Sequence, residues 1–259
     1  MARVKSHLRM NGSLGNLSMY ERDGKTIIRQ KGGGSKEKIR TAKSCQRIRE
    51  SNSEFAAVSS ISAEMRYALG KDLPYYSDCD MIGNLVGHMK LLIAKGTGEP
   101  GSRALDVLSD RDILRGFEFN KHVHFDHCFK APIEITVTES RNTAVLQTVF
   151  CPVKDIVFPD GATSFTIVHT LLRFPRFEKQ EKRRQYLPVD LNDSLSAVSE
   201  ISERYYAGLD LRIKLTLTVQ LDVFCSSAGS ALLNIVGIAF YKDGQRMEGV
   251  NAMKIVNVI

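Results

Sequence analysis

The densest group of metal-binding side chain types is KHVHFDHC, at residues 121–128. On an extended strand His122, His124 and Asp126 project to one face. Imidazole and carboxylate groups are common ligands of zinc and related ions. The same spacing also fits an ordinary strand whose polar side faces water. A metal-binding module or metal-dependent enzyme using these three residues is therefore an alternative hypothesis, and no acid–base partner accompanies it.

Basic residues form the second group. Residues 1–50 contain 13 Lys/Arg and 4 Asp/Glu, a net charge of +9, which leaves 23 Lys/Arg and 25 Asp/Glu, or −2, for the remainder. Such a segment can neutralise nucleic-acid phosphates, meet an acidic patch on a neighbouring subunit, or remain solvated. Tyr20 is the only aromatic residue in the segment, so a base-stacking platform is not expected. The predicted nucleic-acid or partner-binding residues are Lys25, Arg29, Lys31, Lys36, Lys38, Arg40, Lys43 and Arg47.

Other motifs give no catalytic site. Gly32-Gly33-Gly34-Ser35-Lys36 lacks the spacing of a phosphate loop and predicts a flexible hinge. No nucleophile elbow, zinc-protease helix or dinucleotide fingerprint occurs, so neither enzymatic activity nor a cofactor is expected. A second basic cluster at residues 173–184 predicts a solvated loop or a further contact to a polyanion or acidic partner.

Several local patterns predict the elements that would position these residues. Asp23-Gly24 between residues 14–21 and 26–31 predicts a β-hairpin, with Lys25, Arg29 and Lys31 on one face. Apolar spacing of three and four predicts helices that begin near Phe55 and near Met81.

A glycine-rich stretch and a serine-rich stretch complete the outline of the chain. The second helix should end before Gly96, and residues 96–103 should form a linker. Residues 193–206 favour a further helix.

The clearest strand pattern is LDLRIKLTLTVQLDV, at residues 209–223, where apolar and polar residues alternate without a break. This pattern predicts a long antiparallel strand with one face in water and a bulge or bend along it. Turn-punctuated strands suggest a β-sandwich or a barrel-like half, and the sandwich is our prediction. The other predicted strands cover residues 117–127, 133–139, 144–150, 163–174, 231–241 and 252–259.

The composition is that of a globular protein, 43% hydrophobic and 25% charged. The longest apolar run, at residues 231–241, is too short to span a bilayer, which predicts a soluble, cytoplasmic protein without a membrane partner. The five cysteines form no C-x-x-C pair and are predicted to be reduced and mostly buried.

The sequence GNLSMY at residues 15–20, followed by Gly24-Lys25, Arg29 and Lys31, resembles the opening of a group of uncharacterised bacterial proteins of similar length. Residues 47–55, 114–120 and 254–256 are also similar to that group. The resemblance implies a bacterial protein, supports the hairpin, and implies no catalytic residue.

Together these patterns predict an α+β, mainly β, fold. It comprises a basic hairpin arm at 1–50, a helical segment at 51–96 and an antiparallel β-sandwich at 104–259. The leading functional hypothesis is a non-enzymatic structural or assembly protein, a homo-oligomer whose basic arm contacts nucleic acid or a neighbouring subunit. A ligand-binding sandwich, for example for carbohydrate, is a third hypothesis, although the absence of tryptophan disfavours a sugar-stacking surface.

Overall fold

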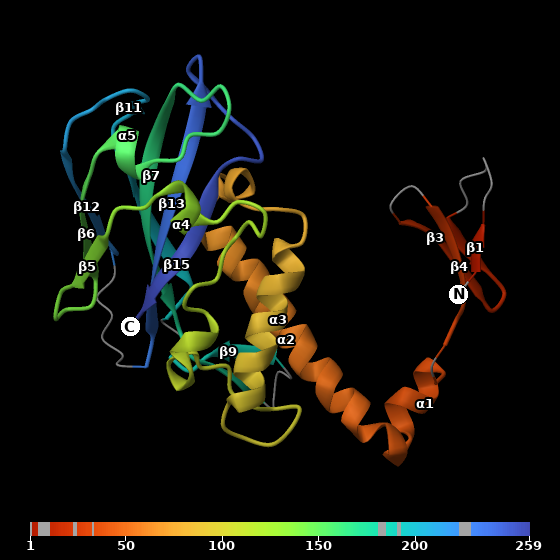
Figure 1. The fold of residues 1–259 in the computed structure, drawn as a ribbon. Coiled ribbons are helices and arrows are strands. Elements are labelled where there is room, and N and C mark those ends of the chain that lie inside the picture. Colours follow the sequence, from red (N-terminus) through yellow and green to blue (C-terminus); the bar gives the residue numbers. More distant parts are fainter. Residues whose placement is uncertain are drawn as a thin grey trace. The chain divides into compact units, whose positions relative to one another are not determined.

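The chain divides into two compact units, which we call the N-terminal unit (Met1–Arg49) and the body (Glu50–Ile259). The computed structural model describes residues 2–4 (backbone), 11–22, 25–32, 34–180, 185–190, 193–222 and 229–259. The fold is mixed α/β with several antiparallel sheets (Figure 1). The predicted helical segment and the predicted strand region belong to one unit, because they share an apolar core.

The N-terminal unit contains an antiparallel sheet in the order β1-β4-β3-β2. The predicted pairing of the hairpin strands is confirmed, with Leu17 opposite Gln30 and Arg22 opposite Lys25. The first hairpin strand begins at Leu17 because Gly15, with a φ of +53°, lies in a turn between β2 and β3. The hairpin turn at residues 23–24 and Gly33 of the predicted hinge lie outside the described residues. The elements are β1 (Ala2–Val4), β2 (Gly12–Leu14), β3 (Leu17–Arg22), β4 (Lys25–Gln30), α1 (Lys36–Thr41) and a 3-10 turn (Lys43–Cys45).

Two long helices, α2 (Gln46–Ala68) and α3 (Met81–Lys95), confirm that both predicted helices exist. The predicted start near Phe55 is wrong, because α2 begins nine residues earlier, at Gln46. Helix α3 ends at Lys95, directly before Gly96, as predicted. The buried stripe of α2 includes Glu54 rather than the predicted Phe55, which is half exposed. The shorter helices are 3-10 turns at Leu73–Tyr76, Val107–Ser109 and Arg111–Ile113, and α4 (Phe125–Cys128) and α5 (Pro152–Asp155).

The body contains a central six-stranded sheet, a three-stranded sheet and a two-stranded sheet, and all their pairings are antiparallel. The central sheet has the order β10-β7-β13-β14, with β11 on β7 and β15 on β13, and the smaller sheets have the orders β12-β6-β5 and β8-β9. The strands are β5 (Ile133–Val137), β6 (Thr143–Phe150), β7 (Ser164–Phe174), β8 (Phe177–Gln180), β9 (Gln185–Pro188), β10 (Ser196–Ile201), β11 (Tyr205–Tyr206), β12 (Ile213–Gln220), β13 (Ala231–Lys242), β14 (Gln245–Arg246) and β15 (Ala252–Val258).

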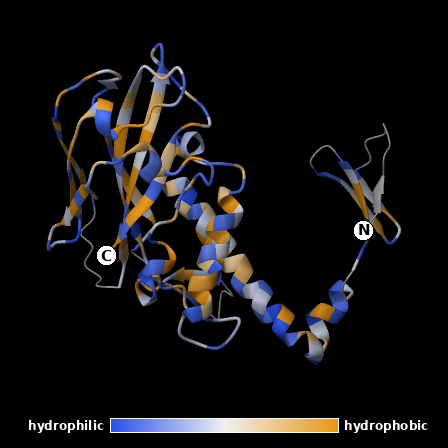
Figure 2. Cartoon of the chain, viewed as in Figure 1, coloured by the Kyte–Doolittle hydropathy of each residue, from blue (hydrophilic) through white to orange (hydrophobic). Residues whose placement is uncertain are grey.

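The central sheet is covered on both faces. On one face, Val168 and Leu172 of β7 pack in a cluster with α2 and α3. On the other, Phe165 and Ile167 of β7 pack with side chains of β6 and β12 (Figure 1). All residues of β7 are therefore buried, and Figure 2 shows hydrophobic residues along the long central strands.

The alternating segment at residues 209–223 forms a shorter strand than predicted. Only Ile213–Gln220 is in β12, where Leu215, Leu217 and Val219 are buried and the intervening residues are exposed. The residues before it are outside the ladder, and Leu211 is 53% exposed. The strand is limited by its partner, because β6 spans only Thr143–Phe150. Residue 223 lies outside the described residues.

The helix prediction for residues 193–206 is wrong, because β10 and β11 occupy this segment. Ser, Val and Ile are weak helix formers, and pairing with β7 decides the conformation. The hydroxyl groups of Ser199 and Thr170 are 2.7 Å apart, and Ile167 N donates to Ser202 Oγ at 2.9 Å.

The linker prediction for residues 96–103 is also wrong, because this segment is tied to α2. Gly101 has a φ of +90°, and a Cβ there would lie 2.9 Å from the Glu50 backbone. Only glycine fits this conformation and this close approach.

In the part of the chain that the structure describes, no helix is both long enough and apolar enough to cross a membrane.

Candidate functional site

The N-terminal sheet has two chemically different faces. Directly opposed residues in an antiparallel ladder share a face, so the register assigns each side chain. Lys25 lies opposite Arg22, and Arg29 lies opposite Ser18 on the same face. We call this the basic face; its described members are Ser13, Ser18, Tyr20, Arg22, Lys25, Ile27 and Arg29.

The other side of the same sheet is what we call the apolar face. Leu14 lies opposite Leu17, and Met19 lies opposite Ile28. Leu14 is 68% exposed and Leu17 is 40% exposed, while Met19 and Ile28 are partly buried. Thr26, Glu21 and Gln30 complete the described residues of this face. An open apolar sheet face of this kind marks a surface that a partner can cover.

The described part of the N-terminal unit has almost no core of its own. Among the described side chains of residues 11–49 only Thr26 and Cys45 are buried. Arg49 holds the end of α1 by donating from Nη1 to the carbonyl oxygens of Ile39 and Ala42, both at 2.8 Å. Small sheets need more buried apolar area than this for independent stability.

The predicted basic residues do not form one surface. Lys25 and Arg29 share the basic face, and the Arg29 guanidinium lies 5.6 Å from the centre of the Tyr20 ring. Lys31 lies just beyond β4 and donates from Nζ to the Gly15 carbonyl at 3.1 Å. On α1, Lys36 and Arg40 are one helical turn apart, whereas Lys38 lies on the opposite side. Lys43 and Arg47 are exposed on the following 3-10 turn and the first turn of α2.

The predicted strand at residues 117–127 is wrong. The predicted metal site required this strand to place its three ligands on one face. Asn120 Oδ1 accepts from the backbone N–H groups of His122 and Val123, at 2.9 and 3.3 Å, which turns the chain. Helix α4 follows at Phe125. Only residues 116–119 run along β15, where Gly116 N donates to Ile255 O at 2.8 Å.

The three predicted ligands consequently do not share one set of contacts. Asp126 forms an ion pair with Lys254, and the His124 ring contacts the His127 ring at 5.4 Å between centres. His122 is exposed. Among the described residues no group of three His, Cys, Asp or Glu side chains is arranged to hold a metal ion.

Sequence reasoning missed Glu118, which lies beside this segment. Its Oε2 accepts from the backbone N–H of Phe125 at 3.2 Å, and its Oε1 is 3.8 Å from His124 Nδ1. Burial raises the pKa of Glu118 to about 7, against the opposing effects of the Phe125 N–H and Lys254. The carboxyl group caps the first turn of α4, so its position has a structural explanation.

Three residues of the second basic cluster, at residues 173–184, form ion pairs or hydrogen bonds within the body. Arg173 is 2% exposed and pairs with Asp193 at 3.2 Å. Arg176 pairs with Glu178 at 2.7 Å. Lys179 donates to Ser53 Oγ at 2.9 Å and to the Gly101 carbonyl at 2.7 Å. These three residues therefore have partners within the body; Lys182, Arg183 and Arg184 lie outside the described residues.

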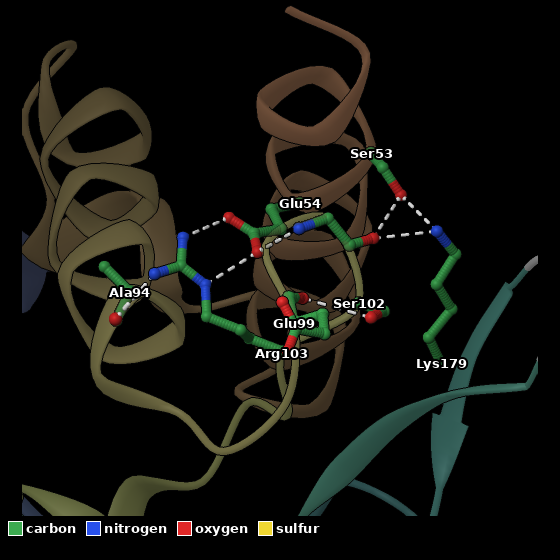
Figure 3. Close-up of polar contacts among 8 residues, drawn as sticks. Ser53, Glu54, Ala94, Glu99, Ser102, Arg103 and Lys179 are labelled. Atoms are coloured by element: carbon green, nitrogen blue, oxygen red, sulfur yellow. Dashed lines mark hydrogen bonds and ion pairs between the residues drawn. The ribbon is translucent and has the colours of Figure 1, made fainter. Parts of the chain in front are cut away.

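A polar network of the body, shown in Figure 3, centres on Glu54. Arg103 donates to both Glu54 carboxylate oxygens, at 2.8 and 2.7 Å, and to the Ala94 carbonyl at 2.7 Å. Gly101 N donates to Glu54 Oε1 at 2.8 Å. Burial would raise the pKa of Glu54, but the hydrogen bonds from Arg103 and Gly101 outweigh it and keep this pKa below its ordinary value. The network clamps residues 97–103 to α2 and α3, which is a structural role.

The described cysteines give no reactive thiol at the histidine segment. Cys45, Cys128 and Cys151 are buried and Cys79 is exposed, and Cys225 lies outside the described residues. Burial raises the pKa of Cys128 to about 11, and the nearby Glu118 carboxyl acts in the same direction. The Cys128 thiol is therefore protonated at neutral pH.

Comparisons with protein-family models, curated proteins and solved structures give no match to this chain. The similarity to bacterial proteins around residues 15–31 therefore remains a prediction. The N-terminal sheet, with its two different faces, is the best candidate functional site.

Proposed function

We propose that the protein is a non-enzymatic assembly protein that associates with a second copy of itself through the apolar face of its N-terminal sheet. The observation that carries this proposal is the exposure of Leu14 and Leu17 on a sheet whose unit has almost no core. Covering this face removes apolar area from water, at about 25 cal/mol per Å².

A second copy suits this face for geometric and electrostatic reasons. A two-fold axis brings the same patch together from both chains, and two sheets pack face to face at about 10 Å. The only charged residue among the described side chains of the apolar face is Glu21. Two basic faces would repel each other, whereas two apolar faces would not.

In this proposal the body is a building block, and its central and three-stranded sheets form the β-sandwich that the alternating strands predict. The metal-dependent alternative is less well supported, because Asp126 is paired with Lys254 and the segment of His122 and His124 is not a strand.

Size-exclusion chromatography with light scattering over a range of protein concentrations tests this proposal. The wild-type chain should form a dimer, and Leu17→Thr/Met19→Thr should be monomeric at the same concentrations. Threonine keeps the strand propensity while removing apolar surface. The matched control is Val149→Thr/Ile201→Thr, which changes half-exposed apolar strand residues in the body and should leave the dimer intact.

A wild-type monomer at every concentration would contradict the proposal. So would a dimer that withstands Leu17→Thr/Met19→Thr as well as it withstands the control. Because the contact is apolar, the dimer should persist as salt is raised.

A further inference from the structure

The basic face lies on the opposite side of the sheet from the proposed self-association surface. Lys25 and Arg29 are four residues apart on β4, a span of about 13 Å along an extended strand. Arg22 lies directly across from Lys25 on β3. All three side chains are exposed. No acidic residue is among the described members of this face.

We propose that the basic face binds the phosphate backbone of duplex nucleic acid. A duplex presents one negative charge per about 1.7 Å of its axis. A row of cations can therefore neutralise phosphates at any position along the duplex. Arginine suits this contact because its planar guanidinium pairs bidentately with phosphate.

The face is built for phosphates rather than for bases. Tyr20 is partly buried, and the Arg29 guanidinium lies over its ring. Stacking of unpaired bases needs an open aromatic surface, and residues 1–50 have no other aromatic residue. Binding should therefore be independent of base sequence, and duplex should be preferred to single strands of the same length.

The face also differs from an ordinary protein-binding surface. Apart from Tyr20 and Ile27, both partly buried, its described side chains are polar or charged. Specific protein interfaces have an apolar centre from which charged residues are depleted. In this sheet the apolar face has such a centre, and the basic face does not. The two faces thus suit two different partners.

Fluorescence anisotropy of a labelled DNA duplex with the full-length chain tests this inference. The double variant Lys25→Gln/Arg29→Gln should bind more than about tenfold more weakly at about 0.1 M salt. The slope of log K against log salt should fall by about 1.8, which corresponds to two phosphate contacts. Charge-preserving Lys25→Arg/Arg29→Lys should bind like the wild type.

The matched control is Lys154→Gln/Arg212→Gln, which removes two exposed positive charges from the body and should leave the affinity and the slope unchanged. Far-UV circular dichroism and light scattering check that Lys25→Gln/Arg29→Gln is folded. The variant should still self-associate, because its substitutions leave the apolar face unchanged.

Three outcomes would overturn the inference: no duplex binding by the wild type at about 0.05 M salt, equal loss of binding in the two double variants, or equal competition by polyglutamate and unlabelled duplex. None of these outcomes bears on self-association through Leu17 and Met19, which light scattering tests separately.

Discussion

At the residue scale, the buried His169 and the partly buried Glu118 lie in positions set by tertiary contacts. His169 on β7 is fully buried, and its Nε2 is 3.2 Å from Asn234 Oδ1 on β13. Burial lowers the pKa of His169 although the Asn234 contact opposes the shift, so the ring is neutral at pH 7. Burial shifts the pKa of Glu118 in the opposite direction, upward, because the neutral form of a carboxyl group is the protonated one. Glu118 therefore stays protonated up to about pH 7.

The raised pKa of Glu118 predicts a definite pH dependence of stability. The unfolded chain releases this proton near its ordinary pKa of 4.5, whereas the folded chain holds it to about 7. The folded state binds more protons in this interval, so stability decreases as pH rises from about 5 to about 8. Glu118→Gln keeps an acceptor for Phe125 N–H and cannot ionise, so it should gain about 2–3 kcal/mol relative to the wild type across that interval.

Urea unfolding at a series of pH values measures the effect. Glu134→Gln, at an exposed position of β5, is the control and should follow the wild-type curve. Parallel curves for Glu118→Gln and the wild type would show that Glu118 ionises normally.

At the element scale, α2 is held in place by a charge within its buried stripe. Glu54 is 5% exposed and Arg103 is 24% exposed, so the pair is shielded from water. Removing the guanidinium leaves a buried carboxylate without its main partner. The segment at residues 97–103 would then be attached to α2 only through the bonds of Gly101 with Glu54 and Ser53.

We predict that Arg103→Gln lowers the free energy of unfolding by about 3 kcal/mol. Arg115→Gln, which breaks an exposed ion pair with Asp112, should cost less than about 0.5 kcal/mol. The double variant Glu54→Gln/Arg103→Gln should recover part of the loss, because no charge remains buried. Denaturant unfolding compares the three variants, and similar losses for Arg103→Gln and Arg115→Gln would contradict the assignment.

At the scale of the whole molecule, the two units differ in how they are stabilised. Among the described residues, the three apolar clusters of buried side chains all draw on the body. The described N-terminal unit instead exposes an apolar face and a basic face. Stability therefore resides in the body, and in our proposal association resides in the N-terminal sheet.

A chain beginning at Gln46, the first residue of α2, should show this separation. Its thermal midpoint should lie within about 3 °C of the wild type, the shift produced by about 1 kcal/mol. It should be a monomer in light scattering and should not bind the DNA duplex. A much lower midpoint would show that the body depends on the removed residues, and a retained dimer would place self-association in the body.

The sequence alone determined the elements with strong local periodicity. Alternation predicted the buried and exposed positions of β12, apolar spacing predicted α2 and α3, and Asp23-Gly24 predicted the β3–β4 pairing. It also located the positive charge within residues 1–50 and two of the basic-face residues, Lys25 and Arg29. These features depend on neighbours a few residues away, which a local pattern records.

Only the tertiary structure decided which partners distant residues have. Glu54 meets Arg103, residues 196–201 pair with β7 instead of forming a helix, and the turn at Asn120 separates the predicted metal ligands. The basic face also needed the β3–β4 register, which adds Arg22 and excludes the residues of α1. Burial and cross-strand pairing join residues far apart in the chain, and their energies exceed the weak local preferences of Ser-rich and His-rich segments.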